Sequence, residues 1–467
     1  MQADSRKIIS ENIVADRSKL KIICVFLHRI YFGRIPYERQ YRGKKRKAMN
    51  ITELQQSYAS HPNVEGVCRL LKDNSVRHLY CGGLYASAAS LFSSVLVQRA
   101  TCPLVFILGD MEEAGYFYHD LTQILGTEQV LFFPSSFRRA IKYGQKDAAN
   151  EILRTEVLSR LQKGEEGLCV VTYPDALAEK VVSRKELGEN TLKLHAGERV
   201  DMNFVTDVLR SYGFEYVDYV YEPGQYAVRG SIIDVFSFSS EYPFRIDFFG
   251  DEVESVRTFE VETQLSKEKK ESIVIVPDLS HSLEKKGSGG MVSFLDFLPS
   301  DSLLAMRDFL WLRERIQTVH DESLTPQAIA ARESEENGAI TLEGKLIDGG
   351  EFTLRALDFR RMEFGNKPTG TPDATVSFHT TVQPIFHKNF DMVAESFREY
   401  LSRHYTIYIC SDSLKQTDRI RAIFEDRGDN ISFTAVERTL HEALPTTLCV
   451  SASLPTISCS TAFTSIT

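Results

Sequence analysis

Residues 221–264 constrain the fold more than any other part of the chain. Apolar β-branched and aromatic residues recur at strand spacing in two runs, 226–236 and 244–248, and these predict two short strands. The segment 237–243 between them is rich in turn-forming residues, and Gly224, Gly230 and Gly250 stand where the backbone must bend. The sequence therefore predicts a compact antiparallel β element.

Three charged side chains interrupt this β element. Arg229 lies within an apolar run, and Arg245 and Asp247 flank Ile246, so both charged residues share one face of a strand. Such a face is ordinarily solvated surface. It can also be a protein-docking surface, because arginine and aromatic side chains are enriched in interface hot spots. The residues alone leave both interpretations open.

Strands alternate with helical stretches on both sides of this element. Strand-like apolar runs lie at 76–81, 103–108, 130–134, 169–172 and 301–306, and helical apolar spacing occurs between several of them. This alternation predicts an α/β fold with a parallel sheet covered by helices. We assign the run 273–278 to the same sheet. Near the C-terminal end, from about Val376, helix-, strand- and helix-like segments at 386–401, 405–410 and 414–424 predict a small α/β unit.

The residues after the first strand have the position of a phosphate-binding loop. The pattern G-x-x-x-x-G-K-[ST] aligns with Gly83, Ala88, Ala89 and Ser90, so alanines replace the second glycine and the lysine. The lysine supplies the positive charge that holds the β- and γ-phosphates. We therefore predict a degenerate nucleotide loop that binds no cofactor and serves as a strand-to-helix turn.

Other site chemistries have little support in the sequence. The acidic residues of GDMEE at 109–113 are expected at a helix N-terminus, where the helix dipole favours them, rather than around magnesium. The eight cysteines contain no C-x-x-C pair and the 11 histidines show no H-E-x-x-H spacing. We expect no metal site, no catalytic residue, and reduced thiols.

Charge is unevenly distributed along the chain. Residues 1–47 carry a net charge of +9, which leaves −18 for the remainder. An acidic body disfavours a large nonspecific nucleic-acid footprint, which requires clustered basic residues. The basic run RGKKRK at 42–47 is a nucleic-acid patch, a solvated tail, or part of a nonnative leader that precedes the true start at Met49. Residues 441–467 contain 11 Ser or Thr and no Lys or Arg, and we interpret them as an atypical tail.

Two segments, PGQYAVRGSIIDVF at 223–236 and PFRIDFFGDEVESVRTF at 243–259, carry a resemblance to a known family. They resemble the second domain of the excision-repair protein UvrB and, more closely, the matching module of the bacterial transcription-repair coupling factor (Mfd) family. Within that family, the sequence is most similar to the Bacteroidetes type. The resemblance continues more weakly from about Met49 to about Glu437. It implies a degenerate P-loop NTPase-type, helicase-like parallel-sheet domain with an inserted α+β UvrA-binding-like module and a small C-terminal α/β domain.

The resemblance also implies domain boundaries. We expect a leader at 1–48, UvrB-like domain 1a at 49–172, domain 2 at 173–265, domain 1b at 266–372, the small α/β domain at 373–440 and the tail at 441–467. In the family, the RNA-polymerase-binding and translocase domains follow this region, so the sequence is expected to be truncated before them. RNA polymerase, double-stranded DNA, ATP and magnesium are then partners and cofactors of absent regions.

Two functions from different classes remain open. The favoured one is a catalytically silent scaffold that recruits UvrA for nucleotide excision repair, with Arg229, Arg245 and Asp247 as the contact residues that the resemblance implies. The alternative is an ATP-dependent DNA translocase or helicase, as the complete family member would be. The missing loop lysine and motor favour the scaffold. Without a signal peptide or a membrane span, we expect a cytoplasmic protein.

Overall fold

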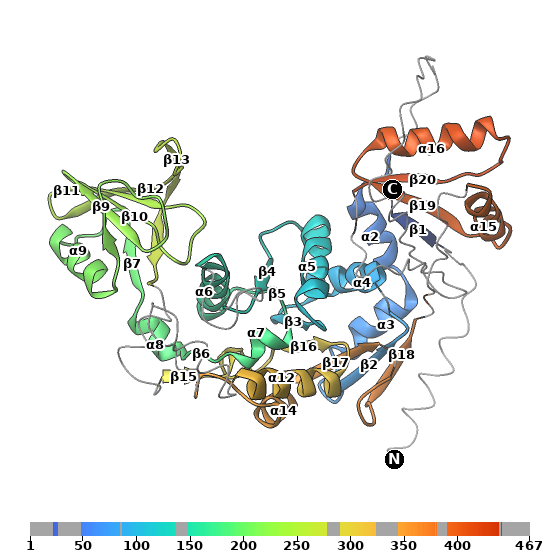
Figure 1. Cartoon of the computed structure of the whole chain (residues 1–467), viewed down its shortest axis with the longest axis horizontal. Helices are drawn as coiled ribbons and strands as arrows, with labels where there is room; N and C mark the ends of the chain where they lie inside the picture. Colours follow the sequence, from blue (N-terminus) through green and yellow to red (C-terminus); the bar gives the residue numbers. More distant parts are fainter. Residues whose placement is uncertain are drawn as a thin grey trace. The chain divides into compact units, whose positions relative to one another are not determined.

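The computed structural model describes residues 22–26, 48–84, 86–136, 148–277, 290–323, 344–365, 367–378, 380, 390–438 and 440. These residues form an α/β protein, as predicted, in which helices and strands alternate along most of the chain (Figure 1). The largest sheet has seven strands in the order β18-β2-β17-β16-β3-β5-β4. The chain divides into two compact units, one of residues 1–130, 303–309 and 360–467 and one of residues 131–302 and 310–359.

The first unit contains five strands of the large sheet, each parallel to its neighbours within the unit. They are β2 (His78–Gly82), β3 (Leu104–Ile107), β16 (Leu303–Met306), β17 (Arg360–Gly365) and β18 (Ala374–Ser377). Every residue of β2, β3 and β16 is buried, as expected for strands with both faces covered. The accompanying helices are α2 (Ile51–Ala59), α3 (Pro62–Leu70), α4 (Ala86–Arg99) and α5 (Met111–Leu125). The predicted parallel sheet is confirmed.

The same unit includes a small sheet of three parallel strands in the order β1-β19-β20. Its elements are β1 (Ile22–Phe26), α15 (Phe390–Ser402), β19 (Thr406–Ser411), α16 (Leu414–Asp426) and β20 (Thr434–Glu437). Phe397 and Phe424 pack into one core with the β19 residues Ile407 and Ile409. The predicted leader therefore contains a strand that the sequence analysis did not foresee. The tail at 441–467 lies outside the described residues.

The second unit begins with the remaining part of the large sheet and its helices. Its elements outside the inserted module are β4 (Val130–Phe133), α6 (Ala148–Lys163), β5 (Cys169–Thr172), α7 (Pro174–Ala178), β6 (Val181–Val182), α8 (Arg184–Glu189), β15 (Met291–Val292), α11 (Phe294–Phe297), α12 (Phe309–Ser323) and α14 (Gly349–Leu357). Buried Glu179 accepts a hydrogen bond from the Ser136 backbone N–H at 3.0 Å and pairs with Arg154 at 3.3 Å. This network ties the loop after β4 to α6.

An antiparallel module lies within the second unit and is organised around the β element predicted from the sequence. Its sheet has six strands in the order β13-β12-β11-β10-β9-β8, with one parallel pair at the β8 edge. The elements are β7 (Leu192–His195), α9 (Met202–Ser211), β8 (Glu215–Tyr216), β9 (Gln225–Arg229), β10 (Ile232–Val235), β11 (Phe244–Phe249), β12 (Glu252–Phe259), β13 (Ser266–Lys270) and β14 (Ser272–Ile275). The first predicted strand is in fact two, because Gly230, with φ of 61°, allows a tight turn between β9 and β10.

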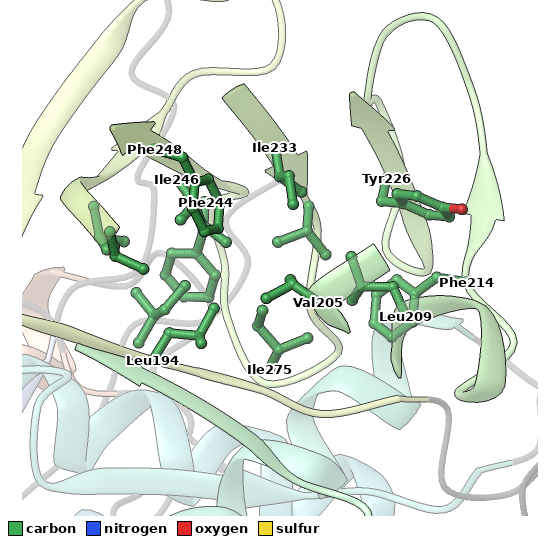
Figure 2. Packing of buried hydrophobic residues seen from close by; sticks show 14 residues of the cluster. Leu194, Val205, Leu209, Phe214, Tyr226, Ile233, Phe244, Ile246, Phe248 and Ile275 are labelled. Carbon is green, nitrogen blue, oxygen red and sulfur yellow. The ribbon is translucent and has the colours of Figure 1, made fainter. Parts of the chain in front are cut away.

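One face of this sheet, which we call the inner face, packs on α9 to form the core of the module. Val205 and Leu209 from α9 point toward Ile233 and Ile246 of the sheet, and all four are buried (Figure 2). Helix α9 begins at Asp201, whose side chain accepts a hydrogen bond from the Asn203 N–H at 2.8 Å. The alternation of buried and outward residues along β11 is the strand pattern predicted from the sequence.

The assignment of residues 273–278 to the parallel sheet is wrong for the part of this run that the structure describes. Strand β14 pairs antiparallel with β7, and its residues Ile273 and Ile275 are buried in the module core. Figure 2 shows Ile275 in this core with Leu194 of β7. An apolar pattern predicts that a strand is buried, but it does not predict the sheet to which the strand belongs. The paired strands β7 and β14 therefore form the entry and exit of the module.

Candidate functional site

The sheet face opposite α9, which we call the outer face, carries the charged residues predicted as a site. Strand register places Asp234 of β10 directly opposite Arg245 of β11, and Arg245 opposite Arg257 of β12. Arg229 of β9 and Asp247 of β11 are each paired with Ile232 of β10. Cross-strand partners share a face, so these charged side chains form one patch. The structure thus brings all three predicted contact residues onto the same surface.

Asp234 is the centre of the patch. Its carboxylate is 1% exposed, and Arg245 donates to both oxygens, from Nε to Oδ1 at 2.7 Å and from Nη2 to Oδ2 at 2.9 Å. These hydrogen bonds raise the pKa of Arg245 above its ordinary value. The Arg245 guanidinium also lies 4.5 Å from the centroid of the Phe259 ring and is only 14% exposed. Arg245 is therefore mainly a structural residue of the outer face.

Arg229 differs from Arg245 in its exposure and in its bonding. It donates to Asp234 Oδ2 through Nη2 alone, and 35% of its side chain is exposed. Its guanidinium lies 5.1 Å from the centroid of the Tyr219 ring, and Tyr219 is 50% exposed. Since Arg245 already satisfies both Asp234 oxygens, Arg229 can turn to another carboxylate without leaving Asp234 unpaired.

Asp247 is not the ionic partner of Arg245. Its Oδ2 accepts a hydrogen bond from Arg257 Nη2 at 3.2 Å, and the two side chains are 24% and 36% exposed. The sequence places Arg245 and Asp247 on one face correctly, but each residue pairs with a different strand. Asp247 and Arg257 therefore form a partly solvated ion pair beside the Asp234 centre.

Two residues of the patch were missed by the sequence analysis. Asp234 lies within the apolar run 226–236, and an acid inside such a run is a signal for a buried ionic partner. Phe249 ends β11 on the same side as Asp247 and is 80% exposed. The signal that could have marked it is the pair Phe248–Phe249, because adjacent residues of a strand point to opposite faces and only one of the two can enter the inner core.

The degenerate nucleotide loop lies between β2 and α4. Gly83 adopts φ of 75°, and a Cβ added there would come within 1.8 Å of the Phe378 carbonyl oxygen. The Phe378 N–H donates to the Gly82 carbonyl at 2.7 Å, and Thr380 donates to the Gly83 carbonyl. The segment after β18 therefore packs directly on this loop.

The helical part of the loop motif is buried. Ala88 and Ala89 are 0% and 7% exposed, and Ser90 Oγ donates to the buried Asp120 Oδ2 at 2.9 Å. In a phosphate-binding loop the hydroxyl at the Ser90 position faces magnesium. Here it faces the helix α5, so its hydrogen bond serves packing.

The acidic GDMEE segment starts helix α5. Asp110 is the N-cap and accepts hydrogen bonds from the N–H groups of Glu112 and Glu113, each at 2.9 Å. The Glu113 carboxylate accepts from the Gly109 N–H and pairs with Arg307. The prediction of a helix N-terminus is confirmed. No group of three potential metal-ligating side chains occurs among the described residues.

Comparison with known proteins assigns the module to a class. Residues 192–281 match the family model described as the UvrB interaction domain. This range begins at β7 and extends past β14, in agreement with the boundaries that the core defines. The chain therefore contains a UvrB interaction domain. Within the described part of the chain, no helix is long and apolar enough to cross a membrane.

The proteins that the chain resembles are transcription-repair-coupling factors. It is 29% identical to that of Escherichia coli K12 over 198 residues, 42% of this chain and 17% of the relative. It is 30% identical to that of Bacillus subtilis 168, over 42% of this chain and 16% of the relative. A factor from Staphylococcus aureus RF122 is 22% identical over 74% of this chain and 34% of its own length. The resemblance inferred from the sequence is confirmed, and the chain spans about a third or less of these relatives.

Proposed function

We propose that the outer face of the UvrB interaction domain binds UvrA, and that the chain recruits UvrA for the coupling of stalled transcription to excision repair. The observation that carries this proposal is the patch formed by Arg229 and Arg245 on buried Asp234 and by Arg257 on Asp247. Two exposed aromatic side chains, Tyr219 and Phe249, accompany it. Arginine and aromatic side chains dominate interface hot spots.

The charge of the module favours a protein partner over a nucleic acid. Residues 192–281 contain 9 Lys or Arg against 17 Asp or Glu, a net charge of −8. Nucleic-acid binding is driven by the release of counterions from phosphates and needs an excess of basic groups. Three arginines held among acids suit a partner that presents carboxylates and apolar groups in a fixed arrangement.

Arg229 is the residue that we expect to contact UvrA most directly. It is the more exposed of the two arginines that pair with Asp234. Its ion pair can break while Arg245 still pairs with the carboxylate. Arg245→Glu, by contrast, places a second carboxylate beside buried Asp234 and would disturb the fold as well as the interface. Arg229→Ala is therefore the cleaner test of binding.

The parallel-sheet domain is proposed to be catalytically silent. Ala89 stands where the phosphate-binding lysine would be, and the segment at Phe378 fills the space over Gly83. Both features remove positive charge and room from the place where a triphosphate would sit. The chain then acts without catalysis: its UvrB-like surface binds UvrA until UvrB takes the place of this chain on UvrA.

A titration of UvrA with the full chain tests the proposal. We expect saturable binding that falls by roughly 30-fold or more in Arg229→Ala, since removing one partner of a buried interfacial charge pair costs about 2 to 5 kcal/mol. The matched control is Arg210→Ala, because Arg210 lies on α9 at the opposite side of the sheet and is 67% exposed. Absence of binding by the folded wild-type chain, or equal binding by Arg229→Ala, contradicts the proposal.

A further inference from the structure

The turn between β12 and β13 presents an apolar residue beside the arginine patch. Leu265 is 69% exposed, and the residue before it, Gln264, adopts φ of 57°. A non-glycine residue at positive φ is energetically costly and persists only where its surroundings hold it. The conformation of Gln264 therefore requires contacts that hold the turn in place.

The turn is fixed by hydrogen bonds on several sides. The Glu260 N–H donates to the Leu265 carbonyl at 3.0 Å, and the Gln264 N–H donates to the Glu260 carbonyl at 2.8 Å. The Gln264 side chain donates to the Val261 carbonyl at 2.8 Å and to the Val220 carbonyl at 3.3 Å. The turn is therefore a rigid platform, which lowers the entropic cost of using Leu265 in binding.

Arg245 joins this platform to the charged patch. Its Nη1 donates to the Gln264 carbonyl at 3.0 Å, while its Nε and Nη2 hold Asp234. Beneath the turn, Phe259 packs with Val220, and partly buried Val261 lies against them. The turn that carries Leu265 is thus bonded directly to the arginine that holds Asp234.

We propose that Leu265 is an apolar anchor of the docking surface and inserts into an apolar pocket of UvrA that lies beside the carboxylates facing Arg229. This inference rests on the proposed function. The argument for this occupant is continuity: one arginine side chain orders both the ion pair and the turn. Arg245 is then a positioning residue for both contacts.

The test compares the affinity of UvrA for Leu265→Ala and for the wild-type full chain. An exposed leucine that becomes buried on binding is expected to make Leu265→Ala about tenfold weaker. Leu265→Asp should bind more weakly still, because it carries a charge into an apolar pocket. Leu354→Ala is the control, since Leu354 on α14 is 67% exposed and lies outside the module. Unchanged hydrogen exchange of the variants would show that the fold is intact.

The outcomes separate this inference from the proposed function. If Arg229→Ala weakens binding and Leu265→Ala binds like the wild type, the anchor is refuted and the docking surface stands. If the wild-type chain does not bind UvrA, both are refuted. Selective loss in Leu265→Ala, with wild-type affinity in Leu354→Ala, supports the anchor.

Discussion

Removal of the Asp234 carboxylate should destabilise the β10 and β11 strands of the module. In Asp234→Ala the Arg245 guanidinium, which is 14% exposed, loses both of its carboxylate hydrogen bonds. Removing one member of a buried ion pair costs about 3 to 5 kcal/mol, because the remaining charge stays desolvated. Arg229 is 35% exposed and can turn to water, so it adds little to this cost.

Hydrogen exchange of the β10 and β11 amides measures this change locally, which suits a chain of several units better than a single melting temperature. A loss of about 3 to 5 kcal/mol corresponds to exchange that is faster by roughly a hundredfold to several thousandfold. Asp247→Ala is the matched control. Its pair with Arg257 is partly exposed, and exposed pairs contribute about 0 to 1 kcal/mol. Wild-type exchange rates in Asp234→Ala would refute the role of Asp234 as the centre of the patch.

Two further predictions concern the degenerate nucleotide loop and the strand beside it. Gly83→Ala should destabilise the parallel-sheet domain by well over the ~1 kcal/mol backbone cost of a left-handed residue, because its Cβ meets the Phe378 carbonyl. The control is Gly428→Ala, which should cost only about that backbone amount in thermal unfolding, because Gly428 has φ of 74° in the turn that ends α16 and no atom lies within 4 Å of the added Cβ. Hydrogen bonds from the His78 and Arg77 N–H groups lower the pKa of Asp373, so its stabilisation is present above the unfolded-state pKa of ~3.9 and is lost as the pH falls through the folded-state pKa. Wild type and Asp373→Asn should therefore differ most in the hydrogen-exchange rates of the β18 amides at neutral pH, and the difference should vanish in acid. A difference that grows in acid would contradict this.

The parts of the fold that depend on local patterns were predictable. Continuous apolar runs such as 104–107 indicate buried parallel strands, and the alternation Phe244, Arg245, Ile246, Asp247 indicates a half-buried one. Both patterns report burial directly, so the structure confirms them. The helix start at Asp110 was predictable for the same reason, since capping is a property of a few consecutive residues.

The parts that depend on long-range pairing were not predictable. Strand β14 looks like any buried strand, and only its pairing with β7, some 80 residues earlier in the chain, places it in the module. Asp234 is the centre of the patch because it pairs with Arg245 on the next strand, and no spacing rule in the sequence links the two residues. The contact between Phe378 and Gly83 likewise joins residues far apart in sequence. Tertiary packing decides such features, and it leaves little trace in a single sequence.

The central claim is that the outer face of the module is a UvrA-binding surface. Hydrogen exchange of the full chain with and without saturating UvrA tests it most directly. We predict slower exchange in the outer-face segments 225–235, 244–249 and 259–265, and unchanged exchange in α9 at 202–211, which covers the inner face. Protection confined to the parallel-sheet domain, or no change anywhere despite binding-competent UvrA, would contradict the claim.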